Sequence, residues 1–91
     1  MLYWNNETIK YLSSAEIFSN SAKLIIDNIK KYFANTENAL EMACGLGNVS
    51  IELSKYFNNI DCFDIEKSPI VFLTNYCENH KINNINQSKK D

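Results

Sequence analysis

Two points of this 91-residue sequence, a glycine turn and an acidic residue after it, have a spacing that suggests a nucleotide-like ligand. The first point is Ala43-Cys44-Gly45-Leu46-Gly47, a turn between a short apolar run and a helical pattern. Glycines there let the backbone approach a ligand closely and turn tightly into the helix. The second is Asp64, at the end of the next apolar run, where a carboxylate can accept both hydrogen bonds of a ribose diol. Glu41 places an acid inside the first run, where an unpaired carboxylate is costly to bury.

For the other chemically reactive residues, a structural role is the favoured interpretation. His80, the only histidine, lies late in a predicted helix and is interpreted as a surface or capping residue rather than a base. Cys44 stands at a helix start, where a thiol can be acidified, but it has no catalytic partner nearby and is interpreted as a small packing residue. The amino-terminal aromatics Tyr3, Trp4 and Tyr11 either pack against the fold, which is favoured, or form a lid over the ligand.

A helix is predicted before the first strand, from Ser13 to about Phe33, with Ser13 and Glu16 as a capping box. Apolar residues at spacings of three and four define its expected buried face: Phe18, Ala22, Ile25, Ile29 and Tyr32 or Phe33.

The turn and Asp64 are each expected to follow a strand and precede a helix. A short buried strand is predicted over residues 39–44, a helix over 48–57 and a second strand over 60–65. Ser68-Pro69 starts the last helix, whose expected buried side is Ile70, Leu73, Tyr76 or Cys77, and His80. Ile82 and Ile85 argue for a third strand. Such alternation predicts an α/β fold with parallel strands and helices on the faces of the sheet.

The segments around both acids resemble the cofactor motifs of class I S-adenosylmethionine-dependent methyltransferases. Residues 39–48 are similar to the first motif, an acid followed by G-x-G-x-G, with Ala43 at the first glycine position. Residues 60–69 look like the next block, a strand ending in an acid before a Ser-Pro helix start, and residues 84–91 like the third. The resemblance implies a Rossmann-like three-layer sandwich that is incomplete here, with about three strands and a helix before them.

The family's cofactor roles carry over to matching positions. Gly45 and Gly47, with the backbone around Ala43 and Cys44, would line the methionine and ribose part of S-adenosylmethionine. Glu41 would face its amino group through water.

The adenosine part of the cofactor is assigned in the same way. Asp64 would take the ribose hydroxyls and Ile65 would pack on the adenine face. Asp91 would accept a hydrogen bond from the adenine amino group. The resemblance thus implies an enzyme that transfers the cofactor's methyl group, with an acceptor and catalytic residues that the sequence does not identify.

Two alternatives stay open. Residues 45–50 fall one residue short of the dinucleotide motif G-x-G-x-x-G, with Ser50 at the third glycine, and a dinucleotide site has no use for Glu41. The other alternative is a non-catalytic module or remnant that keeps cofactor affinity or only the fold.

The expected organisation is an amino-terminal helical segment, residues 1–36, followed by a truncated cofactor-binding half-domain, residues 37–91. The 91 residues alone are not expected to be a complete enzyme. One side of the first strand would lack a neighbour along Leu40 to Ala43, so the isolated chain is expected to dimerise or aggregate through that edge.

Composition sets broad limits on function. The sequence has nine Lys, eleven acidic residues and no Arg. This lack of a positive surplus weakly favours a small-molecule acceptor of the methyl group over RNA. No apolar run approaches the roughly 18 residues that span a bilayer, and no secretory signal is seen, so a cytoplasmic location without membrane contact is expected. Three widely spaced cysteines fit neither a disulfide framework nor a zinc site, and no metal is expected.

Overall fold

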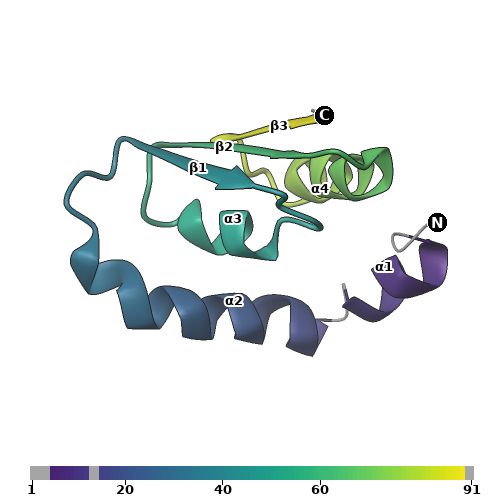
Figure 1. Ribbon diagram of the computed structural model, residues 1–91, viewed down its shortest axis with the longest axis horizontal. Coiled ribbons are helices and arrows are strands. Elements are labelled where there is room, and N and C mark those ends of the chain that lie inside the picture. Colours follow the sequence, from purple (N-terminus) through teal and green to yellow (C-terminus); the bar gives the residue numbers. More distant parts are fainter. Residues whose placement is uncertain (1–4, 13–14, 90–91) are drawn as a thin grey trace.

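The computed structural model of the chain describes residues 5–12 and 15–89 (Figure 1). Its helices are α1 (Asn6–Leu12), α2 (Ala15–Ile29), α3 (Asn48–Leu53) and α4 (Lys67–Asn79), with a short 3-10 turn, η1 (Lys30–Tyr32), after α2. Its strands are β1 (Asn38–Met42), β2 (Asn59–Asp64) and β3 (Ile85–Lys89). None of these described helices is long and apolar enough to cross a membrane.

The three strands form one parallel sheet in the order β1-β2-β3. Glu41 of β1 lies opposite Cys62 of β2, and Asp64 of β2 lies opposite Lys89 of β3. Because all strands run the same way, their carboxyl ends share one edge of the sheet. The turn after β1 and the end of β2 therefore meet there, as the alternation of elements predicts.

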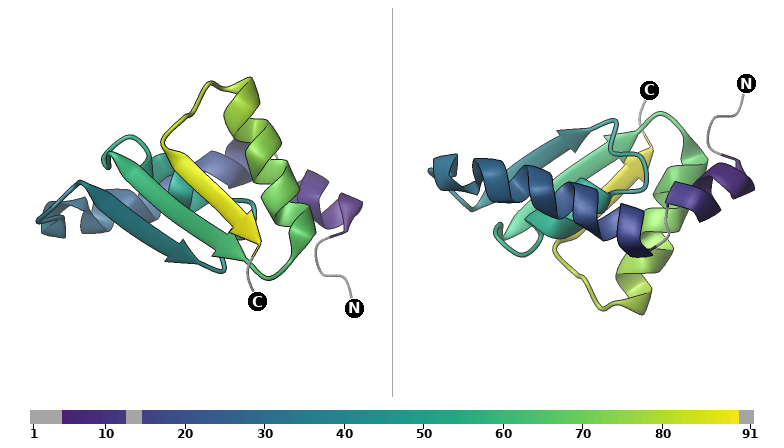
Figure 2. Two further views of the ribbon diagram at one scale, coloured as in Figure 1. Left: turned by 90° about the horizontal axis from the view of Figure 1, so that it is seen from above. Right: turned by 90° about the horizontal axis from the view of Figure 1, so that it is seen from below.

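All described helices lie on one side of the sheet. Seen from above, the strands lie in front of α2 and α3; seen from below, the helices lie in front of the strands (Figure 2). The described residues thus form two of the three layers expected for a Rossmann-like sandwich. On the open face, Leu40 and Met42 are 62% and 66% exposed. Although a buried strand was predicted here, β1 is an edge strand whose side chains alternate between exposed and half-buried.

The core lies between the sheet and the helices and centres on β2. Ile60 and Cys62 of β2 are buried, and Leu73 and Cys77 of α4 pack against them from the helix side. Ile26 joins the same cluster from α2. A strand with neighbours on both sides can bury one whole face, which explains why β2 alternates exposed and buried residues.

The buried face of α2 differs from the predicted one. Ala22 and Ile26 are each 1% exposed, whereas Ile25 and Ile29 are 49% and 42% exposed. The sequence offers apolar residues on two adjacent faces of this helix, and packing against α3 selects the one that carries Ile26. Phe18 and the capping box at Ser13 lie outside the described side chains.

Two further predictions about the helices were wrong. The helix after the turn ends at Leu53 rather than Phe57, and Phe57 instead packs edge-on against Phe33 with ring centroids 4.9 Å apart. His80, expected on the buried side of its helix, is exposed at the end of α4, where its ring stacks on Tyr76 with centroids 3.9 Å apart; its interpretation as a surface or capping residue is confirmed. Because α4 ends at Asn79, His80 lies just beyond the last turn, whose Cys77 still packs in the core.

Candidate functional site

The turn between β1 and α3 is built from residues with left-handed backbone. Ala43, Gly45 and Gly47 have φ values of 53°, 57° and 81°. The turn closes through a 3.0 Å hydrogen bond from the Gly47 N–H to the Cys44 carbonyl. Left-handed φ strains residues that carry a Cβ, so glycine suits two of these positions, and Ala43 adopts the conformation at some cost.

Gly47 is also required by packing. A Cβ at this position would lie 2.5 Å from Cδ1 of Leu73, a fully buried residue of α4. The absence of a side chain at Gly47 therefore lets α4 pack closely at the start of α3. This contact lies in the core.

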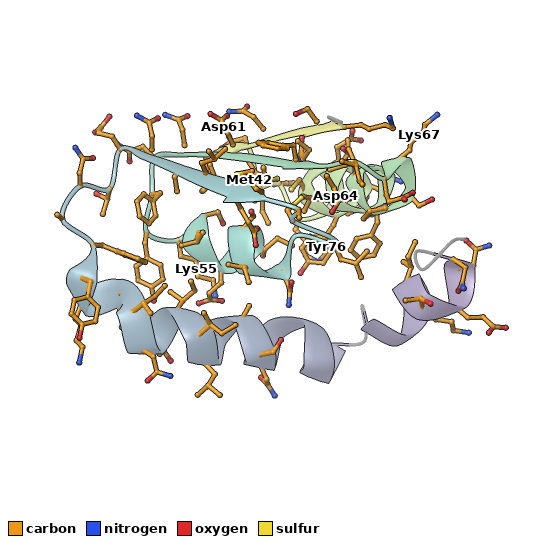
Figure 3. The ribbon with its side chains drawn as sticks, viewed as in Figure 1. Met42, Lys55, Asp61, Asp64, Lys67 and Tyr76 are labelled. Atoms are coloured by element: carbon orange, nitrogen blue, oxygen red, sulfur yellow. The ribbon has the colours of Figure 1, made fainter. Side chains whose placement is uncertain are left out.

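Asp64 joins the turn to the loop after β2. Its Oδ2 accepts a 3.0 Å hydrogen bond from the Gly45 N–H, and its Oδ1 accepts one of 2.9 Å from the Glu66 N–H. The side chain is buried, on the helix side of the sheet, whereas Asp61 of the same strand stands on the open face (Figure 3). An ionised carboxylate offers about four acceptor positions, so about two remain for a ligand.

Glu41 lies half-buried on the helix side of β1, and Ser50 of α3 is its partner. The Ser50 Oγ donates a hydrogen bond to Glu41 Oε1. Burial raises the pKa of Glu41, while hydrogen bonds from the Ser50 side chain and backbone act in the opposite direction. Sequence reasoning missed this contact: it noted Ser50 only where a dinucleotide motif would have glycine. The available signal was a small hydroxyl residue in the first turn of the helix that follows an unexplained acid.

Cys44 is a core residue rather than an acidified thiol. It is 5% exposed and belongs to the main hydrophobic cluster. The neighbouring Cys62 thiol and burial both raise the pKa of Cys44, which keeps its thiol protonated. The interpretation as a packing residue agrees with this environment.

The remaining predicted residues fall in three places. Ile65 follows Asp64 directly and is 63% exposed, so it offers apolar surface beside the carboxylate. His80 ends α4 at the opposite edge of the sheet from the turn, because this helix runs back from the end of β2. Asp91, Tyr3, Trp4 and the Tyr11 side chain lie outside the described part of the structure.

Residues 3–89 match the family model described as tRNA (uracil-5-)-methyltransferase, which is nearly the whole chain. The chain belongs to this family. A curated relative, the tRNA/tmRNA (uracil-C(5))-methyltransferase of Campylobacter lari, is 39% identical over 61 residues, which make up 67% of this chain and 17% of the relative. The family member described here therefore spans less than a fifth of that relative's length.

Solved structures show that the fold is that of S-adenosylmethionine-dependent methyltransferases. One from Aquifex aeolicus superposes with a TM-score of 0.72 over 97% of this chain and 48% of its own, at 13% identity. Coclaurine N-methyltransferase, solved with N-methylheliamine and S-adenosylhomocysteine, gives 0.69 over 87% of this chain and 24% of its own, at 11% identity. The predicted family resemblance and α/β fold class are confirmed.

Proposed function

We propose that this chain is the S-adenosylmethionine-binding part of an enzyme that methylates a uracil base of tRNA at C5. The observation that carries the proposal is the hydrogen bond between Asp64 and Gly45, which unites the glycine turn and the acid of β2 at one edge of a parallel sheet. The match of residues 3–89 to the family model supports it.

The residues at this edge fit the cofactor. When bound, S-adenosylmethionine supplies a methyl group activated by its sulfonium. Asp64 has about two acceptor positions left for the ribose hydroxyls, and its existing hydrogen bonds already orient it. Ile65 presents exposed apolar surface for the adenine, and the Gly45 turn brings backbone close to the methionine part. The Glu41 carboxylate would hold the cofactor's amino group.

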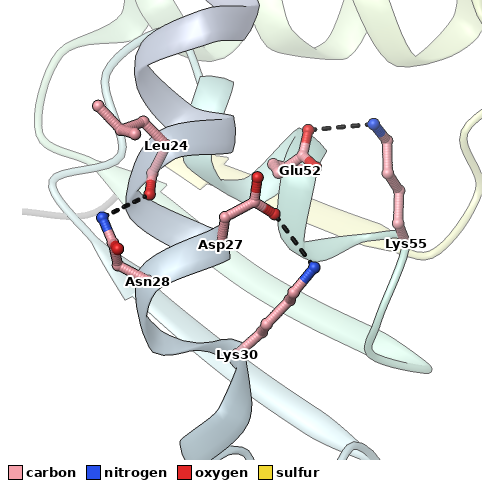
Figure 4. Close-up of polar contacts among 6 residues, drawn as sticks. All are labelled: Leu24, Asp27, Asn28, Lys30, Glu52 and Lys55. Carbon is pink, nitrogen blue, oxygen red and sulfur yellow. Dashed lines mark hydrogen bonds and ion pairs between the residues drawn. The ribbon is translucent and has the colours of Figure 1, made fainter.

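The proposed acceptor is RNA rather than the small molecule that composition favoured. The support is that the family model and the Campylobacter lari relative both carry tRNA in their names. Two lysines of the α2–α3 surface are already paired with acids: Lys30 lies 3.2 Å from Asp27, and Lys55 lies 3.0 Å from Glu52 (Figure 4). We assign the main RNA contacts to the regions that such relatives have in addition to this one. We place the reaction in the cytoplasm.

The proposal is tested by calorimetric titration of the chain with S-adenosylhomocysteine. Wild type is expected to bind it saturably, and Asp64→Ala to bind about ten- to a hundred-fold more weakly, since a hydrogen bond to a charged group contributes about 1.5–3 kcal/mol. Asp61→Ala is the matched control: Asp61 is exposed on the same strand, and its Oδ1 accepts a 3.0 Å hydrogen bond from Asn86 on the open face.

Two results would contradict the proposal. One is equal affinity of wild type and Asp64→Ala, which would place the ribose elsewhere. The other is saturable binding of a nicotinamide dinucleotide in place of S-adenosylhomocysteine, which would favour the dinucleotide alternative. Circular dichroism of each variant separates lost contacts from lost folding, because Asp64 also holds the Gly45 turn.

The length of the chain favours a second candidate, a cofactor-binding module without turnover. The chain covers 17% of the Campylobacter lari relative. Such a module would bind S-adenosylhomocysteine yet transfer no methyl group from the labelled cofactor to a tRNA transcript. Transfer of label by the 91 residues alone would exclude this candidate.

A further inference from the structure

Ser50 is completely buried in the first turn of α3, and its hydroxyl is directed at the acid of the site. It is 0% exposed, and its Oγ donates to Glu41 Oε1 from the helix to the neighbouring strand. A buried hydroxyl needs a partner, and a buried carboxylate needs donors, so each group satisfies the other. At this depth water has little access to replace the serine.

Among the described residues, no ion pair stabilises the Glu41 carboxylate. The titratable groups that interact with it are the Cys44 and Cys62 thiols. Among the described side chains of α2, residues 20–29, the buried ones are Ala22 and Ile26, and Lys23 and Asp27 are exposed. On α3, the charged Glu52 is paired with Lys55.

Ser50 is therefore the main polar support of Glu41. Burial raises the pKa of Glu41, and the Ser50 side chain and backbone lower it. Removing the hydroxyl would disfavour the charged form, because the carboxylate would lose a donor without leaving its buried site.

We propose that Ser50 is a positioning residue for the cofactor: its hydroxyl holds the Glu41 carboxylate in place to receive the cofactor's amino group. This inference rests on the proposed function, in which Glu41 binds that amino group. Ser50 itself acts through Glu41.

The test compares Ser50→Ala, Ser50→Thr and Ser54→Ala in two measurements. Ser54 is the matched control, because its Oγ donates to the Ile51 carbonyl at 2.6 Å and serves only the end of α3. The first measurement is a carbon-13 NMR titration of the Glu41 carboxyl; the second is calorimetric affinity for S-adenosylhomocysteine across a pH series. Ser50→Cys, with a thiol of similar size that donates weakly, replaces Ser50→Ala if the alanine variant does not fold.

In Ser50→Ala, the pKa of Glu41 is expected to rise by about 1 pH unit, and the affinity at neutral pH to fall about tenfold. Binding needs the carboxylate, so it weakens as pH falls through this pKa, and the variant loses affinity at a higher pH than wild type. Threonine is expected to restore both values, and Ser54→Ala to change neither. In a Glu41→Gln background, Ser50→Ala should cause no further loss.

An unchanged Glu41 titration in Ser50→Ala would overturn the inference, as would an unchanged affinity at every pH. Either result leaves the proposed function intact if wild type binds S-adenosylhomocysteine and Asp64→Ala binds it about ten- to a hundred-fold more weakly. Failure of wild type to bind would instead overturn the proposed function and, with it, the cofactor role of Ser50.

Discussion

At the scale of single residues, Glu41 occupies a position where folding alone favours an apolar side chain. It shares the helix-facing side of β1 with Ala39, which packs against the core. Its pKa is raised by burial, which means that the charged carboxylate is less stable in the folded chain than in the unfolded one. A residue that costs stability in its charged form is a strong candidate for a functional role.

We expect Glu41→Gln to stabilise the fold at neutral pH and to leave it unchanged in acid. Below the usual pKa near 4.5, the carboxyl is protonated in both folded and unfolded chains, and Gln resembles it. As pH rises through the higher folded-state pKa, wild type loses stability and the variant does not. The gain at pH 7 should be at most about 1 kcal/mol, allowing for the partial exposure of this carboxylate.

Urea unfolding at pH 4 and pH 7 measures this difference. Glu78→Gln, at an exposed position of α4, serves as the control and should show no such pH dependence. A Glu41→Gln variant less stable than wild type at pH 7 would argue that the charge itself supports the fold.

At the scale of elements, the packing of α2 decides which of its isoleucines supports the core. Ile25, Ile26 and Ile29 all lie in an apolar stretch, but only Ile26 reaches the cluster formed by the sheet and α4. The neighbouring Asn48 of α3 lies 3.3 Å from Ser21 of α2, Nδ2 to Oγ, which helps to set the rotation of α2 against α3.

We expect Ile26→Ala to lower the free energy of unfolding by about 2–5 kcal/mol, because it removes a fully buried side chain and leaves a cavity. Ile25→Ala, at a half-exposed position of the same helix, should cost less than about 1 kcal/mol. Urea unfolding of both variants tests this. Equal costs would mean that α2 packs with a different face toward the sheet.

At the scale of the whole molecule, the sheet is covered on one face only. Parallel sheets normally bury both faces, but Figure 2 shows the described helices on one side of this sheet only. On the open face of the edge strand β1, Leu40 and Met42 expose apolar side chains. The chain also spans only part of the proteins that it resembles. An apolar edge of this kind favours pairing with another polypeptide.

We expect the isolated chain to associate through β1 as concentration rises, and Leu40→Lys with Met42→Lys to reduce that association. Both positions are exposed, so the substitutions should disturb the folded monomer little. Sedimentation velocity over a range of concentrations measures the effect. Leu24→Lys, at a 67% exposed position of α2, is the matched control and should leave association unchanged. A wild-type chain that stays monomeric at high concentration would refute this expectation.

Local patterns account for most of what could be predicted. The glycine turn, the helix start at Ser68-Pro69 and the strand that ends in Asp64 depend on neighbouring residues, and each lies where it was expected to within a few positions. The wrong predictions arose where the local pattern allows two alternatives equally well, such as Ile25 or Ile26 as the buried isoleucine of α2. Periodicity cannot make that choice when two adjacent helix faces are apolar.

The sequence by itself therefore determined the order of helices and strands, the parallel fold class and the family, because backbone preferences and motifs act over short distances. Only the tertiary structure decided which groups contact the residues of the site. Ser50 donates a hydrogen bond to Glu41, the Gly45 N–H donates one to Asp64, and the Leu73 side chain fills the space that a Cβ at Gly47 would occupy. The physical reason is that such contacts join different elements. Hydrogen-bond geometry and close packing depend on how those elements lie against one another, which no local pattern encodes.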